Sequence, residues 1–269
     1  IFDHFLMSLS LIKYLLKKKN KPNLVFIGFP PIETSFIMSL YCKWNNIPYV
    51  LDIKDLWPFI FVEHFPKKYR KFFTYLLIPY IFMANYCSSK AAIITGPSKG
   101  YLNSIKKLFK INPRTKTLLF PLSSENKNSV ISKDDIVFIN KFIKNKDLPV
   151  ISFAGSMMRS AYDFKTVREA LNILEKAGIK FNFLIAGDGE NKEKLLSLFS
   201  NLKSASFTGW LNQSKLEVLY NISTAIIAPY RNNLNYKGHI PNKVYDSFRA
   251  NKPLITTLEG DTTNLINKY

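Results

Sequence analysis

The chain has 269 residues, of which 47% are hydrophobic and 14% aromatic, which excludes global disorder and allows two domains with cores. Its net charge of +19 is uneven, because residues 1–124 carry 18 basic and 5 acidic side chains and residues 125–269 carry 20 and 14. The resulting +13 on the first part favours contact with an anionic membrane surface or a nucleic acid. The alternative is compositional, since lysine and asparagine also become frequent in an AT-rich genome.

Cysteine and histidine are scarce in this sequence. Cys42 and Cys87 lie far apart, and the three histidines form no cluster with the spacing of metal ligands. We therefore expect a reduced, cytoplasmic setting, with no metal ion and no other cofactor.

The chain opens with an apolar run, Phe5 to Leu16, which three lysines follow. In a signal peptide the charges would precede the apolar core, and a run of about a dozen residues is too short to span a bilayer. The run predicts an amphipathic helix packed on a sheet, with membrane contact as the alternative.

The next segments alternate between strand and helix patterns. Asn23–Phe29 is a continuous apolar run that stops at Pro30 and Pro31, Phe36–Trp44 has a helical pattern, and Tyr49–Ile53 has that of a strand. This β-α-β order predicts a doubly wound parallel sheet, whose ligands bind beyond the carboxyl ends of the strands.

The most hydrophobic segment is Tyr69–Cys87, which Pro79 interrupts. Its uninterrupted part is too short for a transmembrane span, so it predicts a helix whose aromatic face meets the core or a lipid interface. Strands at Ala91–Thr95 and Thr117–Phe120, with a helix over Tyr101–Phe109 between them, complete a first domain over residues 1–124.

A polar, lysine-rich segment, residues 125–147, predicts a linker with one exposed helix over Ile136–Ile143. Residues 148–269 then repeat a strand–turn–helix pattern, which predicts a second doubly wound domain. Its strands are expected at Val150–Phe153, Phe181–Ile185, Ser206–Leu211 and Thr224–Ala228. Neither G-x-G-x-x-G after the first strand nor G-x-x-x-x-G-K-[ST] occurs, which argues against dinucleotide and P-loop sites.

The last pattern, Gly238 to Thr257, predicts a loop, a helix that begins after Pro241, and a short strand. A helix N-terminus presents free backbone N–H groups and a positive dipole end, which suits a phosphate. Lys243 in the first turn adds a cation, and Asp246 one turn later can accept hydrogen bonds from sugar hydroxyls. An ordinary helix of an α/β domain is the alternative.

This segment, GHIPNKVYDSFRANKPLITT, resembles the donor-site helix of glycosyltransferase family 4. FAGSMMRSAYDF, LIAGDGENKEKL and FTGWLNQSKLEVLYNISTAIIAPY resemble further turns of that donor domain, in the same order, and DIKDLWP resembles a segment of the first domain. The sequence departs from the family where Gly238 and Asp246 replace two glutamates, where Thr224 replaces a frequent aspartate and where Phe59 replaces an acidic residue. Relative to the family, both ends of the chain look trimmed.

The resemblance implies the GT-B architecture, in which two doubly wound, Rossmann-like domains face each other across a cleft. Residues 1–124 would form the acceptor-side domain and residues 148–269 the donor domain, with Arg159 and Lys243 at the diphosphate and no metal. The implied donor-binding residues are Gly155, Ser156, Arg159, Gly187, Asp188, Gly189, Tyr230, Gly238, His239, Ile240, Pro241, Lys243 and Asp246. The implied acceptor-side residues are Pro30, Pro31, Asp55, Trp57 and His64. The alternative for each of these residues alone is structural, in which Asp55 caps a turn and Trp57 fills the core. No catalytic nucleophile is assigned.

The resemblance further implies a bacterial-type, retaining transferase in cell-surface glycan synthesis, at the inner face of the cytoplasmic membrane. It would move a sugar, with an N-acetylated hexosamine as one candidate, from a nucleotide-sugar to a lipid-linked or polysaccharide acceptor. The alternative is a catalytically weak or inactive relative that binds a nucleotide-sugar or scaffolds a partner. A nucleic-acid-binding protein has only the charge in its favour, since the sequence lacks a recognition motif.

Overall fold

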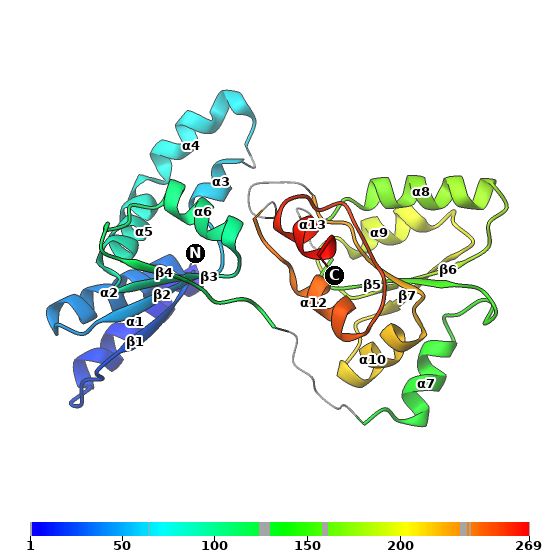
Figure 1. The fold of residues 1–269 in the computed structure, drawn as a ribbon, viewed down its shortest axis with the longest axis horizontal. Coiled ribbons are helices and arrows are strands. Elements are labelled where there is room, and N and C mark those ends of the chain that lie inside the picture. The colour runs from blue at the N-terminus through cyan, green and yellow to red at the C-terminus, as the bar shows by residue number, and fades with distance from the viewer. Residues whose placement is uncertain are drawn as a thin grey trace. The chain divides into compact units, whose positions relative to one another are not determined.

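The chain forms two compact units, each built on its own sheet (Figure 1). The computed structural model describes residues 2–63, 65–123, 130–157, 161–231, 236 and 238–268. The first unit comprises Ile1–Pro121, Lys237–Ile240 and Gly260–Tyr269, and the second comprises Leu122–Tyr236 and Pro241–Glu259.

The first unit contains a four-stranded parallel sheet in the order β1-β2-β3-β4. Its strands are β1 Val25–Phe29, β2 Tyr49–Ile53, β3 Ile93–Gly96 and β4 Lys116–Leu119. All residues of the inner strand β2 are buried, as expected for a parallel strand with both faces covered. The strands predicted for this part of the chain are confirmed, with small shifts at their ends.

The helices of the first unit are α1 Phe2–Lys17, α2 Ile32–Trp44, α3 Phe59–Glu63, α4 Arg70–Leu76, α5 Ile78–Lys90, α6 Lys99–Leu108 and α13 Asp261–Ile266. The apolar run that was predicted as one helix forms two, α4 and α5. Pro79 lies in the first turn of α5, where its missing N–H costs no helical hydrogen bond. Helix α1 packs against α2 and leaves several apolar side chains exposed, among them Leu16.

The second unit contains a five-stranded parallel sheet in the order β7-β6-β5-β8-β9. Its strands are β5 Val150–Ala154, β6 Asn182–Ala186, β7 Ala205–Gly209, β8 Ala225–Ala228 and β9 Leu254–Thr256. Its helices are α7 Lys133–Asn140, α8 Phe164–Lys176, α9 Lys192–Phe199, α10 Gln213–Ile222 and α12 Asn242–Arg249. The strand order reverses beside β5, which makes a topological switch point of the kind where Rossmann-like sheets bind ligands.

Strand β6 shows how the sequence pattern positions this sheet. Phe183 and Ile185 lie in one buried cluster, together with Phe153, and Leu184 and Ala186 lie in a second cluster. Since successive side chains of a strand point to opposite faces, the two clusters are the two covered faces of the sheet. Both faces are therefore packed, and the ends of the strands are left for a site.

Helix α7 is part of the second unit, although an exposed linker helix was predicted there. Ile139 is fully buried in the cluster that contains Leu219, and α7 packs against α10. Ser132 and Asp135 form a capping box, in which each side chain accepts a hydrogen bond from the other residue's N–H. The helix is exposed on one side only, since Ile136 and Val137 face solvent while Phe138 in it and Phe142 and Ile143 after it pack against the cluster beside Ile139.

The end of the chain also groups differently from the expected donor domain, residues 148–269. Helix α13 and the segment before α12 are part of the first unit. The Gly100 N–H donates to the Asp261 carboxylate over 2.7 Å, and the Thr262 hydroxyl donates to the His239 carbonyl over 3.0 Å. The carboxylate lies at the N-terminus of α6, where its charge complements the helix dipole.

The predicted fold class is confirmed, since the protein is an α/β protein with two parallel-sheet, Rossmann-like halves. In the part of the chain that the structure describes, no helix combines the length and the apolar character needed to cross a membrane.

Candidate functional site

A cavity of about 450 Å³ lies in the second unit, where β5 and β6 end. It is lined by Ala154, Gly155, Ser156, Ala186, Gly187, Asp188, Trp210, Leu211, Leu216, Tyr220, Lys243 and Asp246. The sequence-predicted members of this set are Gly155, Ser156, Gly187, Asp188, Lys243 and Asp246. The structure therefore brings together three turns and two helices, α10 and α12, that are far apart in the sequence.

Backbone hydrogen bonds tie the turns of the cavity together. The Gly155 N–H donates to the Ala186 carbonyl over 3.0 Å, and the Gly187 N–H donates to the Gly209 carbonyl over 2.8 Å. These bonds continue the pairing of the sheet beyond its strands. Gly187 has φ +138°, and a Cβ built on it would lie 1.9 Å from the Gly155 carbonyl oxygen. Only glycine fits this position without a shift of the backbone.

Gly189 was predicted as a donor-binding residue, and it contributes to the packing of the same turns outside the cavity lining. Its φ is +148°, and a Cβ there would lie 3.0 Å from the Met157 nitrogen. The Met157 N–H in turn donates to the Asp188 carbonyl over 2.8 Å. Gly189 thus lets two turns approach each other closely, beside the cavity that Asp188 lines.

Lys243 is the cation of the cavity, and it is almost fully buried in the first turn of α12. Its ammonium group donates a hydrogen bond to the Ala154 carbonyl and lies 4.8 Å and 5.4 Å from the ring centroids of Phe153 and Tyr162. Burial lowers the pKa of Lys243 to about 8, against the opposing influence of the Asp246 charge. The side chain is therefore a poorly hydrated cation.

The first N–H groups of α12 receive no hydrogen bond from the side chain of the N-cap residue, Pro241. Gly155 lies opposite, and a Cβ on it would lie 2.1 Å from the Lys243 Nζ atom. The missing side chain of Gly155 therefore leaves the space that the ammonium group occupies.

Two carboxylates border the cavity. Asp188 accepts a hydrogen bond from the Gly189 N–H over 2.8 Å and pairs with Lys192 at 3.2 Å, and these contacts lower its pKa. Asp246 lies one helical turn after Lys243 and is partly exposed. Both carboxylates are placed to accept hydrogen bonds from hydroxyl groups of a ligand.

The apolar wall of the cavity was not predicted. Trp210 is 72% exposed and lies at the rim, and Leu211, Leu216 and Tyr220 continue the wall. Large exposed aromatic side chains beside a polar cavity are suited to stack on a planar ring. The position of Trp210, directly after the glycine that ends β7, was the available signal.

Several predicted donor residues lie outside this cavity. Tyr230 is in the core, where its ring packs 4.8 Å from those of Tyr162 and Tyr236. Gly238, His239 and Ile240 also lie outside it and belong to the first unit, and Pro241, the N-cap residue of α12, does not line it either. His239 there packs 5.5 Å from the Tyr101 ring, and burial, followed by the Lys54 charge, lowers its pKa to about 4. The predicted Arg159 and His64 lie outside the described residues.

The other acceptor-side residues lie where strands of the first unit end. Pro30 and Pro31 follow β1, and Asp55 and Trp57 follow β2. The Trp57 ring packs against Phe61, with ring centroids 4.7 Å apart. These residues share one edge of the sheet, because the carboxyl ends of parallel strands lie on the same side.

Sequence reasoning missed a buried polar pair at that edge. Asp52, the fourth residue of β2, accepts a hydrogen bond from the Thr95 hydroxyl over 2.6 Å and lies 3.3 Å from the Lys54 ammonium group. It was missed because a single aspartate within an apolar run gives no information about its partners.

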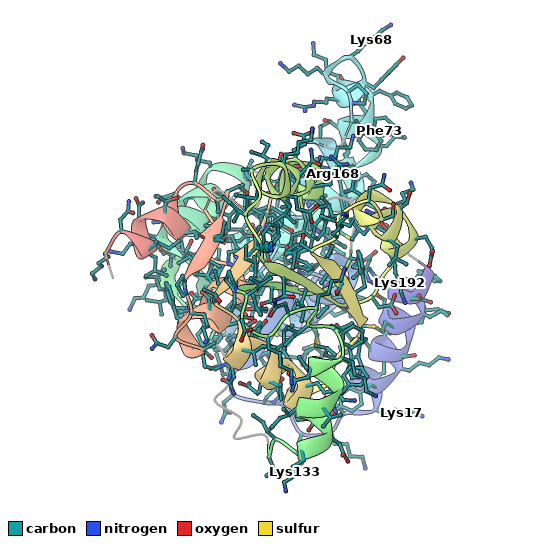
Figure 2. The ribbon with its side chains drawn as sticks, turned by 90° about the vertical axis from the view of Figure 1, so that its right-hand side faces the viewer. Lys17, Lys68, Phe73, Lys133, Arg168 and Lys192 are labelled. Atoms are coloured by element: carbon teal, nitrogen blue, oxygen red, sulfur yellow. The ribbon has the colours of Figure 1, made fainter. Side chains whose placement is uncertain are left out.

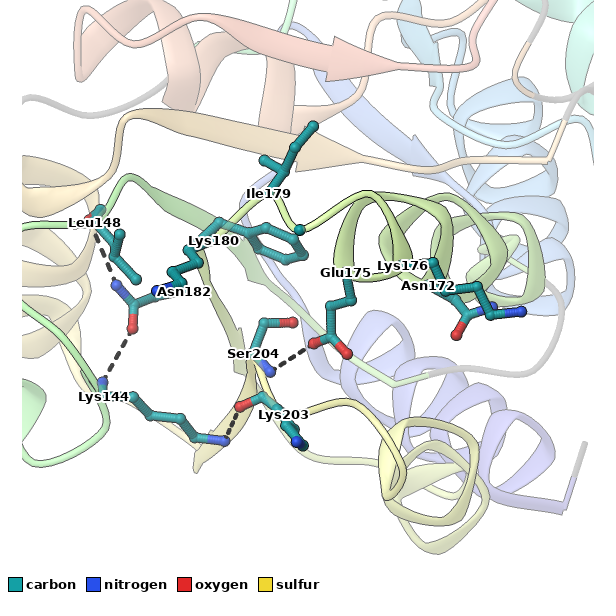
Figure 3. Close-up of a pocket in the computed structure, with 12 residues that line it drawn as sticks. Lys144, Leu148, Asn172, Glu175, Lys176, Ile179, Lys180, Asn182, Lys203 and Ser204 are labelled. Carbon is teal, nitrogen blue, oxygen red and sulfur yellow. Dashed lines mark hydrogen bonds between the residues drawn. The ribbon is translucent and has the colours of Figure 1, made fainter.

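A second cavity of the second unit, of about 470 Å³, is lined by polar groups that stabilise the fold (Figure 3). Asn182 is almost fully buried there, accepts from the Lys144 N–H over 3.0 Å and donates to the Asn145 carbonyl over 2.8 Å. Glu175 accepts from the Ser204 N–H over 2.8 Å. These polar groups join the start of β6 to neighbouring loops.

We expect Asn182→Ala to lower the free energy of unfolding by about 2 kcal/mol, since it leaves buried backbone groups without partners. Urea-induced unfolding would measure the loss. Asn172→Ala is the control, because Asn172 lines the same cavity and is only partly buried. Equal effects of the two substitutions would contradict the role of Asn182.

In the part of the chain that the structure describes, no group of three or more His, Cys, Asp or Glu side chains could hold a metal ion. The metal independence of the site stays a prediction.

Comparison with known proteins relates the second part of the chain to sugar transfer. Residues 148–268 match the family model described as "Glycosyl transferases group 1". The second part of the chain is therefore similar to this family. No curated protein matches the chain by sequence.

Solved structures match both units. Sucrose-phosphate synthase from Thermosynechococcus elongatus is 13% identical with a TM-score of 0.65, over 94% of this chain and 60% of that one. Anabaena HepE, solved in complex with UDP-glucose, is 12% identical with a TM-score of 0.66, over 95% of this chain and 65% of that one. WaaG, a glycosyltransferase involved in lipopolysaccharide biosynthesis, is 13% identical with a TM-score of 0.61, over 88% of this chain and 67% of that one. These likenesses show the fold, which is that of GT-B glycosyltransferases, and the chain spans less than two thirds of the first two structures.

Proposed function

We propose that this protein is a GT-B glycosyltransferase that uses a nucleotide-sugar donor. One observation carries the proposal. A nearly buried lysine in the first turn of α12, an aspartate one turn later and two glycine turns line one cavity in the part of the chain that matches the glycosyl transferase family. A departing nucleoside diphosphate gains negative charge during transfer, and fixed cations and N–H groups stabilise that charge.

Each part of the cavity has a role in this proposal. Lys243 and the N-terminus of α12 bind the diphosphate without a metal ion, and Asp246 accepts hydrogen bonds from ribose hydroxyls. Gly155 leaves space for the Lys243 ammonium group, and Gly187 and Gly189 let the turns around the ligand approach each other closely. Retention of the anomeric configuration and transfer of an N-acetylated hexosamine are further elements of the proposal, and both come from the resemblance to family 4.

The acceptor belongs to the same proposal. We place a lipid-linked or polysaccharide acceptor at the carboxyl edge of the first sheet, near Asp55 and Trp57. The charge of +13 on residues 1–124 supports a peripheral position on an anionic membrane surface, in the synthesis of a cell-surface glycan.

A thermal-shift screen against UDP-, GDP-, dTDP- and CMP-sugars, in the presence of EDTA, tests the donor site. A ligand that binds only the folded protein raises the melting temperature. We expect one nucleotide class to do so for the native protein and not for Lys243→Ala. If the folded protein responds to none of these donors, or the variant responds as the native protein does, the assignment of this site fails.

An inactive nucleotide-sugar-binding relative is the second candidate, favoured by Gly238, which replaces a family glutamate and lies in the first unit rather than in the cavity. Donor hydrolysis and transfer assays separate the two candidates. Binding without turnover on any lipid or saccharide acceptor would favour the second.

Trp210→Ala is expected to weaken donor binding about tenfold, because the loss of one aromatic ring stacked on a base costs roughly 1–3 kcal/mol. Calorimetric titration with the donor found in the screen would measure it. Trp44→Ala is the matched control, since Trp44 is also highly exposed and lies in the first unit. An unchanged donor affinity in Trp210→Ala would contradict the stacking of the nucleotide base on this side of the cavity.

A further inference from the structure

Acidic residues are absent from one long part of the first unit. Residues 64–121 contain 11 lysines and arginines and no aspartate or glutamate, and residues 122–124 are uncharged. This part includes α4, α5 and α6 with strands β3 and β4. Of the +13 on residues 1–124, this segment therefore carries +11 and has no carboxylate of its own.

The same part exposes large apolar side chains. Six of them on and beside α4 and α5 are each more than half exposed: Tyr69, Phe72, Tyr75, Leu76, Ile78 and Phe82. Figure 1 shows α4 extending away from the sheet of the first unit, and Figure 2 places Lys68 and Phe73 on this projecting segment. Aromatic and aliphatic side chains beside lysines and arginines are the composition of a helix that lies in a membrane interface.

A groove of about 610 Å³ continues this surface along α5. One wall is a single face of α5, with residues spaced at helical intervals, and the other is the turn at residues 110–113. The turn is fixed, because the Lys110 N–H donates to the Asn85 side chain over 2.8 Å and the Ser88 hydroxyl donates to the Lys110 carbonyl over 2.8 Å. The lining residues are Ile78, Ile81, Phe82, Asn85, Tyr86, Ser89, Lys90, Lys110, Ile111, Asn112 and Pro113.

The groove changes from apolar to cationic along its length. Ile78, Ile81 and Phe82 line the end at the start of α5, and Lys90 and Lys110 lie at the other end. Twelve residues of helix separate Ile78 from Lys90, which corresponds to about 18 Å. A molecule that fits this gradient has an apolar chain and an anionic group at one end.

The cationic end does not lie at the acceptor edge. Lys90 is followed by β3 and Lys110 by β4, so both lie where strands begin. Ligands of parallel sheets bind where the strands end, which in this unit is the edge with Pro31 and Asp55. The groove is therefore separate from the proposed acceptor site.

We infer that this groove and the exposed face of α4 bind an anionic phospholipid of a bilayer. The acyl chain lies along Ile78 and Phe82, and the phosphate lies between Lys90 and Lys110. This inference rests on the proposed membrane partner, but it requires neither sugar transfer nor donor binding. Vesicle binding can therefore be absent although the donor site binds its nucleotide-sugar. It can also be present although the donor site binds none.

Co-sedimentation of the full chain with vesicles tests this inference. One set contains phosphatidylcholine alone, and the other contains phosphatidylcholine and phosphatidylglycerol in equal parts. We expect binding only to the second set, and we expect Lys90→Gln/Lys110→Gln to weaken it about 25-fold, since each basic residue at an anionic surface contributes roughly fivefold.

The matched control is Lys106→Gln/Lys107→Gln, which removes the same charge from exposed positions of α6 outside the groove. This double variant should bind the anionic vesicles less than about threefold more weakly than the native protein. Equal losses in the two double variants would show attraction by net charge and overturn the groove. So would equal binding to both vesicle sets, or no binding to either.

A fluorescent label reports on the chain-binding end. Cys42 and Cys87 are fully buried, so Ile78→Cys provides an accessible thiol. An environment-sensitive dye at position 78 should be quenched by vesicles whose acyl chains carry a nitroxide. The same dye at Ile173→Cys, an exposed position on α8 of the second unit, should not be. Equal quenching at both positions, or none at 78, would exclude the proposed orientation.

Discussion

Gly187→Ala is expected to destabilise the second unit by about 3–5 kcal/mol and to abolish donor binding. The added methyl carbon would lie 1.9 Å from the Gly155 carbonyl oxygen, and the backbone at φ +138° is strained for any residue with a side chain. The obstacle is backbone rather than a flexible side chain, so the turns that form the cavity floor must separate. Urea-induced unfolding followed by Trp210 fluorescence measures the effect, because Trp210 is the one tryptophan in the sequence of the second unit.

Gly178→Ala is the matched control for this substitution. Gly178 also has a positive φ, +75°, but a Cβ there meets nothing within 4 Å. It should cost only about 1 kcal/mol, the ordinary penalty of a left-handed conformation. If the two substitutions cost the same, then backbone conformation alone explains the need for glycine at 187, and the close approach of the two turns contributes nothing.

The strand–helix alternation and the floor of the cavity could be predicted from the sequence for the same reason. Apolar runs that end in Gly or Pro predict parallel strands, and parallel strands bring the turns after them to one edge. Gly155, Gly187 and Asp188 each follow such a run. Their convergence therefore depends only on the topology, which a short sequence pattern can specify.

The remaining features depend on packing that local pattern does not encode. Trp210 and Tyr220 reach the cavity through the positions of β7 and α10 in the sheet. His239 precedes Lys243 by four residues and was expected beside it, yet the two belong to different units. Asp261 meets the start of α6 across 161 positions of the sequence. Such contacts follow from the course of the chain in space.

Lys243→Met is expected to stabilise the ligand-free protein while abolishing donor binding. A lysine at this site has its pKa lowered to about 8 from the usual 10.5, so the folded state opposes the charge. This difference corresponds to about 3 kcal/mol at neutral pH. The hydrogen bond to Ala154 and the contacts with Phe153 and Tyr162 remain as partial compensation, so we expect a net gain of about 1–3 kcal/mol from the methionine. Thermal unfolding with and without a nucleotide-sugar measures both effects.

The pH dependence separates a ligand-binding lysine from a structural one. Between pH 8 and 10.5 the unfolded chain holds a proton on Lys243 that the folded protein has released, so this residue makes stability rise with pH in that window. Donor affinity should change in the opposite direction, since the diphosphate requires the ammonium form, and it should fall as pH rises above about 8. In Lys243→Met both pH-dependent contributions disappear. A structural lysine would behave differently: its replacement would lower the melting temperature, and donor affinity would stay the same. That result would exclude Lys243 from the diphosphate site.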